Sequence, residues 1–141
     1  MPSVLIIDDN RADADLIKEA LREVDLSVQV FSVENAVLGF AFLSKQSGFS
    51  QMPTPALVVL DINMPVITGL QALRLIRETG DWNAIPVMIW SSSSRREDRE
   101  DALRSGAIEY VVKPAAWEGH VALAHRIAKL VAVRDAGAAA G

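Results

Sequence analysis

The sequence predicts an α/β fold: a doubly wound, three-layer sandwich in which five strand–helix units build a parallel five-stranded sheet. Two patterns predict it. Short aliphatic runs alternate five times with segments whose apolar residues recur at helical spacing. The runs are continuous rather than interrupted by polar residues, as expected of parallel strands that are covered on both faces. Since parallel crossovers are right-handed, few topologies remain, and we expect the strand order 2-1-3-4-5.

The first two units are predicted from residue spacing. Residues 4–7 are aliphatic and predict the first strand, and apolar residues recur along one helical face over 12–24. Residues 28–31 predict the second strand. The segment 34–45 is apolar nearly all round, a pattern that a buried strand shares, but its length and its polar flanking residues favour a helix.

The middle of the chain begins with a loop rich in Ser, Gly and Pro at 46–55. The aliphatic residues 56–60 predict the third strand, and helical apolar spacing over 69–79 predicts the helix that follows it. A fourth aliphatic run at 86–90 predicts the fourth strand.

The last two units complete the alternation. Ser94 is followed three residues later by Glu97, which fits a capping box and predicts a helix over 95–105 with Ser94 as its N-cap. The fifth strand is predicted at 108–112 and a final helix at 117–133.

Length and composition limit the class of protein. The 141 residues suit one domain, which we place at 1–134, and the Ala- and Gly-rich residues 135–141 predict a disordered tail. The absence of Cys excludes disulfide scaffolds and Cys-ligated metal sites. A formal charge of -4 argues against broad contact with nucleic-acid phosphates. No apolar run suits a membrane span or a signal peptide, so we expect a cytoplasmic protein.

Polar residues stand where four of the predicted strands end. Asp8 and Asp9 follow the first strand, Asp61 the third, Ser91 the fourth and Lys113 the fifth. Because the carboxyl ends of parallel strands meet at one edge, where ligands bind beside the reversal of strand order, we expect these side chains to converge. Asp8, Asp9 and Asp61 then form an acidic cup, flanked by a hydroxyl and an ammonium.

The acidic cup requires compensation of its charge. At ~4 Å and an effective dielectric constant near ~20, each pair of carboxylates costs ~4 kcal/mol. The cup therefore needs a cation, a raised pKa or the fixed ammonium of Lys113. Oxygen ligands without His or Cys suit Mg²⁺. An Asp beside such a cation, an ammonium and a hydroxyl is an environment that favours phosphoryl transfer to the carboxylate.

Simpler explanations exist for each residue taken alone. Asp8, Asp9 and Asn10 have the side chains that cap helices. Asp61 fits an ordinary turn between a strand and a helix, and Lys113 fits a solvated strand end. These explanations do not account for the expected convergence of the acids with one lysine.

Five separated motifs follow the predicted strands in a fixed order: Asp8-Asp9, Asp61-Ile62-Asn63-Met64-Pro65, Gly69, Ser91 and Lys113-Pro114. Together they resemble the receiver domain of two-component response regulators. The resemblance covers roughly residues 3–133, almost the whole chain. It implies a phosphoacceptor signalling protein that catalyses only its own phosphorylation and dephosphorylation, and it implies the flavodoxin-like strand order given above.

The resemblance also implies roles for the residues of the cup. Asp61 would accept a phosphoryl group from a histidine kinase. Mg²⁺ would be held directly by Asp9, by Asp61 and by the main-chain carbonyl of Asn63, while Asp8 would act mostly through a bound water.

The resemblance also assigns roles to three further residues. Ser91 would hydrogen-bond one phosphoryl oxygen, and Lys113 would pair with another. Tyr110, on the fifth strand, matches an aromatic that swings inward when the switch serine, Ser91, moves. The Lys113–Pro114 peptide bond matches one that is cis in receivers.

A narrower resemblance concerns the start of the first helix, at Asp9, Asn10, Asp13, Leu16 and Ile17. Together with the loop 46–55 and the absence of an output domain in this sequence, these residues resemble stand-alone regulators that partner bacterial and cyanobacterial phytochromes. Arg11 departs from that group, which commonly has Pro there. The resemblance implies a sensor histidine kinase, in this narrower form a phytochrome, and a downstream protein or phosphotransfer partner.

The final helix has an apolar arc of about half its circumference, wider than the ~100° that one buried face needs. Leu123 and Leu130 lie beside the main stripe. They predict either a deeply seated helix or a partner or homodimer surface on the last two helices, as receivers use. His120 and His125 are expected at the surface, without a metal partner.

Other functions remain open on sequence grounds. A flavodoxin-like enzyme or nucleotide binder would want glycines after the first strand, where residues 8–13 have none. An Asp-nucleophile phosphatase would usually have a second acid at Asn63. A receiver-fold scaffold that works without phosphorylation would not need a complete acidic cup.

Overall fold

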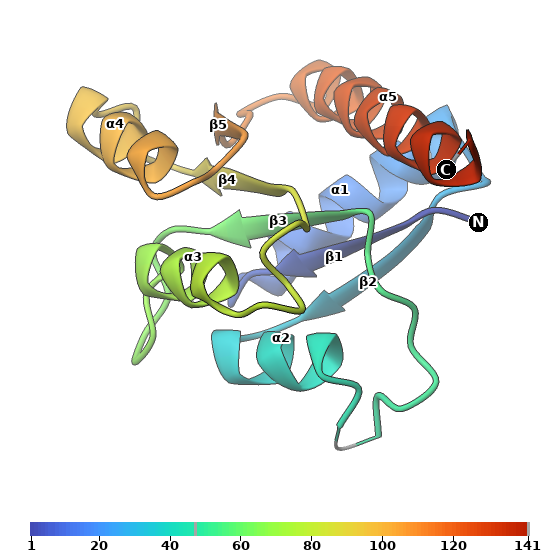
Figure 1. Cartoon of the computed structure of the whole chain (residues 1–141). Coiled ribbons are helices and arrows are strands. Elements are labelled where there is room, and N and C mark those ends of the chain that lie inside the picture. The colour runs from blue at the N-terminus through green and yellow to red at the C-terminus, as the bar shows by residue number, and fades with distance from the viewer. Residues whose placement is uncertain (47, 141) are drawn as a thin grey trace.

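The computed structural model describes residues 1–46 and 48–140, with side chains as far as Val133. Five strands alternate with five helices along the chain (Figure 1). The strands are β1 (Ser3–Ile7), β2 (Gln29–Val33), β3 (Leu57–Asp61), β4 (Val87–Ser91) and β5 (Glu109–Val112). The helices are α1 (Arg11–Val24), α2 (Ala36–Leu43), α3 (Gly69–Glu78), α4 (Arg96–Arg104) and α5 (Trp117–Ala140).

The strands form one sheet in the order β2-β1-β3-β4-β5, and every neighbouring pair is parallel. The predicted fold class and strand order are therefore confirmed. Ile7 pairs with Leu60, so Asp8 and Asp61 each follow a paired residue of the two central strands. Asp61 in turn pairs with Trp90 of β4. This register brings the chemistry-bearing residues to one edge of the sheet.

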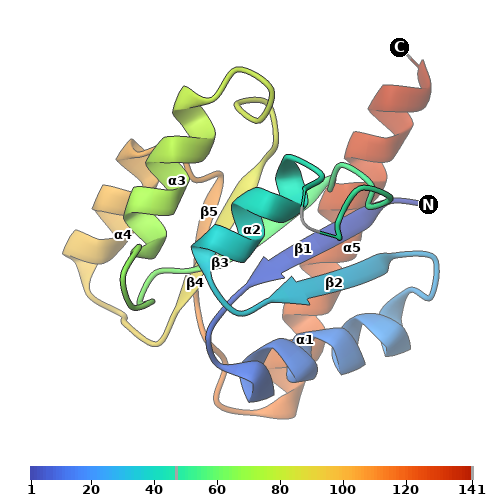
Figure 2. The same ribbon diagram turned by 90° about the horizontal axis from the view of Figure 1, so that it is seen from below.

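Helices cover both faces of the sheet, which produces the three layers (Figures 1 and 2). Side chains of β1 divide between the faces as the two-residue period of a strand requires. Val4 and Ile6 pack with the buried residues of α1 and α5, whereas Leu5 and Ile7 pack with those of α2, α3 and α4. All five β1 residues are buried, which explains why its residues 4–7 are continuously apolar.

The helices α1, α2 and α3 begin at side chains that accept hydrogen bonds from main-chain amides. The side chain of Asn10 accepts from the Asp13 amide at the start of α1, and that of Asn35 accepts from the Leu38 amide at the start of α2. Thr68 and Gln71 form a reciprocal capping box on α3. These bonds satisfy amides that have no partner inside a helix.

The start of α4 differs from the prediction. Arg95 occupies the N-cap position without a side-chain cap, so the predicted capping role of Ser94 is wrong. The hydroxyl of the preceding residue, Ser93, accepts from the Arg95 amide at 3.2 Å and donates to Asp98 at 2.6 Å. A turn made by Ser93, one residue before Ser94, therefore supplies the hydrogen bond at the start of the helix.

The all-round apolar segment does form a helix, α2. Its Gly39 lies against β1, because a Cβ atom added there would lie 2.6 Å from the Cδ1 atom of Ile7. The missing side chain allows the helix to approach the sheet closely, and Phe42 is buried in the core. Val37, by contrast, is exposed, so part of the apolar surface of α2 faces outward.

The final helix is seated more deeply than a surface helix. Leu123 is only 5% exposed and joins the core between α1, α5 and the sheet, and Leu130 is half-buried against the same cluster. The prediction of Leu123 as an interface residue is therefore wrong, since the sheet and α1 already cover it. His120 is also buried, with Nδ1 3.0 Å from the carbonyl oxygen of Ala116, whereas His125 is exposed as predicted.

The helix α5 also runs further than predicted. It continues to Ala140, where the sequence predicted a disordered tail from residue 135. The high helix propensity of alanine accounts for the difference, and residue 141 lies outside the described residues. None of the helices in the described part of the chain combines the length and apolar character that a membrane span needs.

We predict that Leu123→Ala lowers the free energy of unfolding by ~2–4 kcal/mol, because it leaves a cavity in a packed core. Leu130→Ala is the matched control on the same helix, and we expect it to cost less than half as much since that side chain is only half-buried. Urea denaturation measures both. Equal, small losses for the two variants would contradict the placement of Leu123 in the core.

Candidate functional site

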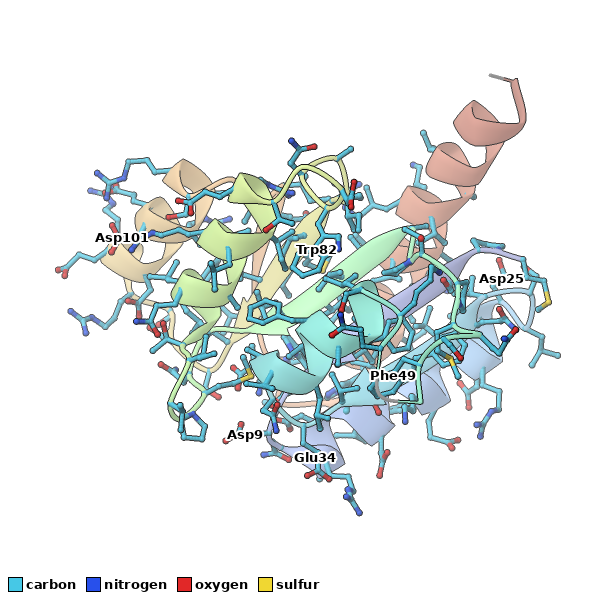
Figure 3. The ribbon with its side chains drawn as sticks, turned by 60° about the horizontal axis from the view of Figure 1, so that its bottom comes forward. Asp9, Asp25, Glu34, Phe49, Trp82 and Asp101 are labelled. Carbon is cyan, nitrogen blue, oxygen red and sulfur yellow. The ribbon has the colours of Figure 1, made fainter. Side chains whose placement is uncertain are left out.

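The predicted acidic cup lies at the carboxyl edge of the sheet. Asp8, Asp9 and Asp61 each offer a carboxylate oxygen, and these oxygens all lie within 4.8 Å of one another. Asp8 is 2% exposed and Asp61 4% exposed, whereas Asp9 is open to solvent. Figure 3 shows Asp9 and Glu34 at this edge, with Asp25 at the other end of α1. The structure thus brings together the three acids that the sequence predicts.

Lys113 reaches the cup from the residue after β5. Its Nζ atom lies 2.9 Å from Asp8 Oδ2 and 3.7 Å from Asp61 Oδ1. The lysine side chain is 13% exposed and that of Asp8 is fully buried, so water screens this ion pair poorly. The ammonium is the fixed counter-charge that the acids require.

A fourth acid, Asp13, also binds this ammonium, with Asp13 Oδ2 2.8 Å from Lys113 Nζ. No role at the site was predicted for Asp13, which belongs to the motif at the start of the first helix. The available signal was its position, since Asp13 lies in the first turn of the helix that follows Asp8 and Asp9. This turn points the side chain back toward the cup.

Trp90 lies below the ammonium. Its side chain is fully buried, and Lys113 Nζ lies 4.8 Å from the centroid of its ring, within the range of a cation–π contact. The indole Nε1 atom has no hydrogen-bond partner among the described residues. The buried ring supplies an apolar wall for the lysine, and the missing partner leaves one polar group without compensation.

Burial, and after it the neighbouring charge of Asp8, raise the pKa of Asp61 from its ordinary value of 3.8 to about 7. The charge of Lys113 and a hydrogen bond from the Asn63 amide lower that pKa but do not cancel the two larger effects. Asp61 is thus a carboxyl group that titrates near neutral pH without a bound cation. A cation at the cup would favour its charged form.

The pKa of Lys113 is governed by opposing effects. Burial lowers the pKa, but the hydrogen bonds to Asp13 and Asp8 and the charges of Asp61 and Asp8 raise it, and the net direction is upward. The side chain therefore stays an ammonium at neutral pH. It can stabilise negative charge that arrives at the cup.

Ser91 and Tyr110 occupy one hydrogen-bonded corner next to the cup. Ser91 is fully buried, and its Oγ atom accepts from the Ser93 amide at 3.0 Å. The Tyr110 hydroxyl donates to the Ser93 carbonyl at 2.7 Å, and its ring is buried with the core residues of α2, α3 and α4. Ser93 therefore connects the two residues to which the resemblance assigns switch roles.

The segment after Asp61 returns tightly to the end of β3. The Asn63 amide donates to Asp61 Oδ1 at 3.4 Å, and the Gly69 amide donates to the Ile62 carbonyl at 3.0 Å. A Cβ atom on Gly69 would lie 2.5 Å from the Ile62 Cα atom and even closer to the Asp61 carbonyl oxygen. Only glycine allows this approach, which is why a glycine begins α3.

The peptide bond before Pro114 differs from the resemblance, since the described residues contain no cis peptide bond. The trans form is the lower in energy for an isolated X–Pro bond, by ~0.5–1 kcal/mol. Pro114 is held from the other side by α5, where a Cβ atom on Gly119 would lie 2.6 Å from Pro114 Cβ. The Lys113 amide donates to the Ser91 carbonyl at 2.7 Å and ties this segment to β4.

We predict that Gly69→Ala displaces Asp61 and lowers the free energy of unfolding by ~1–3 kcal/mol, because the added methyl group meets backbone rather than a flexible side chain. Gly80→Ala is the control, since nothing lies within 4 Å of its added Cβ atom. Urea denaturation measures the stability of both variants. A Gly69→Ala protein as stable as the Gly80→Ala protein would contradict the close approach.

We also predict a pH dependence of stability without divalent cations. The pKa of Asp61 rises from 3.8 to about 7 on folding, so the folded state binds the extra proton and stability falls as pH rises through this interval. Asp61→Asn removes this loss and should raise the free energy of unfolding at about pH 8 by roughly 1–3 kcal/mol, with little change at about pH 4. Denaturation curves across this range test it; parallel pH profiles of the two proteins contradict it.

Comparison with known proteins agrees with this geometry. A family model described as the response regulator receiver domain matches residues 4–124. Response regulator Rcp1 of Synechocystis is 28% identical over 95 residues, which make up 67% of this chain and 65% of Rcp1. Transcriptional regulatory protein PrrA of Mycobacterium tuberculosis is 36% identical over 113 residues, 80% of this chain but 44% of PrrA. The chain thus spans less than two thirds of these relatives.

Solved structures share the fold. The Mn²⁺-bound form of response regulator Rcp1 has a TM-score of 0.80 at 24% identity and covers 90% of this chain and 91% of its own. The phosphorylated cyanobacterial phytochrome response regulator RcpA has a TM-score of 0.83 at 25% identity, covering 92% and 93%. A response regulator in red light signalling of R. palustris has a TM-score of 0.82 at 25% identity, covering 90% and 91%. With the family match over 4–124, this chain belongs to the response regulator receiver domains.

Proposed function

We propose that the chain accepts a phosphoryl group from a sensor histidine kinase on Asp61 and thereby switches a protein-interaction surface. The observation that carries the proposal is the setting of Asp61. Its carboxylate is nearly buried beside two other acids and lies 3.7 Å from a lysine ammonium. A structural role alone does not explain why three acids gather at the edge of a sheet where one of them has a strongly raised pKa.

A divalent cation fits the acidic cup by its chemistry. The cup offers oxygen ligands only, and two of its carboxylates are buried, so a hard cation would remove their mutual repulsion. Asp9, Asp61 and the main-chain carbonyl of Asn63 would hold Mg²⁺, with Asp8 beside them. Rcp1 has been solved with Mn²⁺ bound, which supports a divalent cation in this family. When bound, the cation supplies Lewis-acid charge to the phosphoryl oxygens.

The residues of this chain supply the rest of the chemistry. An oxygen of Asp61 forms the new bond to phosphorus as the bond to the donor imidazole nitrogen breaks, and the donor leaves with the electron pair. The Lys113 ammonium lies close enough to stabilise the charge that arrives on Asp61. The Ser91 hydroxyl, which now accepts from the Ser93 amide, would turn to donate to a phosphoryl oxygen.

The signal would leave the site through the corner of Ser91, Ser93 and Tyr110. Movement of Ser91 toward the phosphoryl group breaks its bond to the Ser93 amide and frees the segment whose carbonyl holds the Tyr110 hydroxyl. Tyr110 belongs to β5 and Ser93 precedes α4, so the change would reach the α4–β5–α5 face. This is a two-state element biased by a local charge.

The proposed function requires two kinds of partner, a kinase that donates the phosphoryl group and a protein that binds the switched surface. The kinase would be a sensor histidine kinase, and the similarity to RcpA and to other phytochrome regulators supports a phytochrome in that role. A downstream protein, a phosphotransfer partner or a second copy of the chain would read the switch. Leu103, Ile108, Val112 and Trp117 are exposed apolar residues of the α4–β5–α5 face and suit such contact better than the buried Leu123.

We predict that acetyl phosphate with Mg²⁺ adds one phosphoryl group, stable in mild acid and labile in alkali, as expected of an acyl phosphate. Asp61→Asn should abolish the labelling because it removes the nucleophilic oxygen. Intact-protein mass spectrometry measures the product. Chelation of Mg²⁺ should also prevent the reaction.

Asp81→Asn is the matched control, since Asp81 is an exposed acid outside the cup. It should be labelled like the unmodified protein. Labelling that persists in Asp61→Asn, or a wild-type protein that no donor labels, would overturn the proposed function.

A further inference from the structure

The ammonium of Lys113 is not centred on the phosphoacceptor. Its two hydrogen bonds go to Asp13 Oδ2 at 2.8 Å and Asp8 Oδ2 at 2.9 Å, whereas Asp61 Oδ1 is 3.7 Å away, beyond hydrogen-bond distance. An ammonium has three N–H donors, so one remains for a group on Asp61. The lysine is therefore held on the α1 side of the cup.

Asp13 is placed firmly enough to hold it. The residue lies in the first turn of α1, where its amide donates to the capping side chain of Asn10 at 3.1 Å. Its side chain is 27% exposed and that of Lys113 13%, so their ion pair is shielded from water more than a surface pair. The ring of Trp90, whose centroid is 4.8 Å from the ammonium, shields another side of the ammonium from water.

We propose that Asp13 is a positioning residue that holds Lys113 against Asp8 and competes with an anion on Asp61 for the same ammonium. An anion on Asp61 would bind the third N–H donor and draw the ammonium toward itself, which would lengthen the bond to Asp13. The strength of that bond then sets how readily the anion is accommodated. The competition rests on the proposed function, since the anion is the phosphoryl group, but the holding of Lys113 does not.

A purely structural role for Asp13 makes a different prediction. A carboxylate in the first turn of a helix stabilises it through the helix dipole by ~0.3–1 kcal/mol. Asp15 lies on the same helix, is exposed and carries the same charge, yet it makes no ion pair with Lys113. Asp15→Asn therefore removes an equal charge from α1 without changing the contacts of Lys113.

The first measurement uses the full chain without metal or phosphodonor. Two hydrogen bonds and a nearby indole should protect the Lys113 ammonium from exchange and shift its proton and nitrogen resonances. Asp13→Asn should move these resonances and speed their exchange, whereas Asp15→Asn should leave them unchanged. Asp13→Glu keeps a carboxylate on the same turn and should restore protection. Identical Lys113 resonances in wild type and Asp13→Asn would overturn the positioning role.

The second measurement uses beryllofluoride with saturating Mg²⁺, as an analogue of the phosphoryl group. Removing the competing carboxylate should tighten its binding about three- to tenfold in Asp13→Asn, on the order of one partly shielded ion pair. Asp15→Asn should bind like wild type. If wild type and Asp13→Asn bind beryllofluoride with equal affinity, the competition between Asp13 and the anion is contradicted, but the proposed receiver function is not.

The two proposals fail in different ways. A wild-type protein that binds no beryllofluoride contradicts the proposed phosphoacceptor function and the competition together. The resonances of Lys113 still decide whether Asp13 holds the lysine, because that measurement requires neither cation nor anion. Unfolding of Asp13→Asn is monitored by its remaining resonances, and Asp13→Glu provides a folded variant that tests the same contact.

Discussion

One ammonium holds the site together. Three carboxylates, from Asp8, Asp13 and Asp61, lie within 4 Å of Lys113 Nζ, and two of them are buried where water cannot screen their repulsion. Without the Lys113 ammonium, the edge of the sheet would carry uncompensated buried negative charge, which would strongly destabilise the fold. With it, the cup keeps enough net negative charge to attract a divalent cation. The lysine thus serves both the stability of the fold and its chemistry.

The fold supplies this arrangement through its strand order. Asp8 and Asp61 follow the neighbouring parallel strands β1 and β3, and the strand order reverses between these two strands, which opens the space above them. Lys113 comes from the edge strand β5 and crosses above β4, where the ring of Trp90 supports its side chain. The same fold could carry other chemistries, and it is the set of side chains at these strand ends that makes this chain a receiver domain.

Much of this could be predicted from the sequence because strand ends are visible in it. Continuous aliphatic runs located the strands, and the carboxyl ends of parallel strands lie at one edge of a sheet. These two facts predicted that Asp8, Asp61 and Lys113 converge. Features that depend on packing could not be read. Leu123 is buried in the cluster that α1 and α5 form with the sheet, and periodicity does not reveal which neighbour covers a wide apolar arc. Asp13 was missed because a helical acid is ordinarily solvated.

The close packing of Gly119 against Pro114 has a mechanical consequence. The Pro114 ring, next to Lys113, packs directly against Gly119 in the first turn of α5, so we expect a shift of one to move the other. Under the proposed function, a protein that tilts this end of α5 would displace the ammonium, and an anion that pulls the ammonium would change the affinity for that protein by the same factor. A partner bound at the terminal helix would then affect phosphoryl transfer at Asp61, just as phosphorylation would affect the binding of that partner.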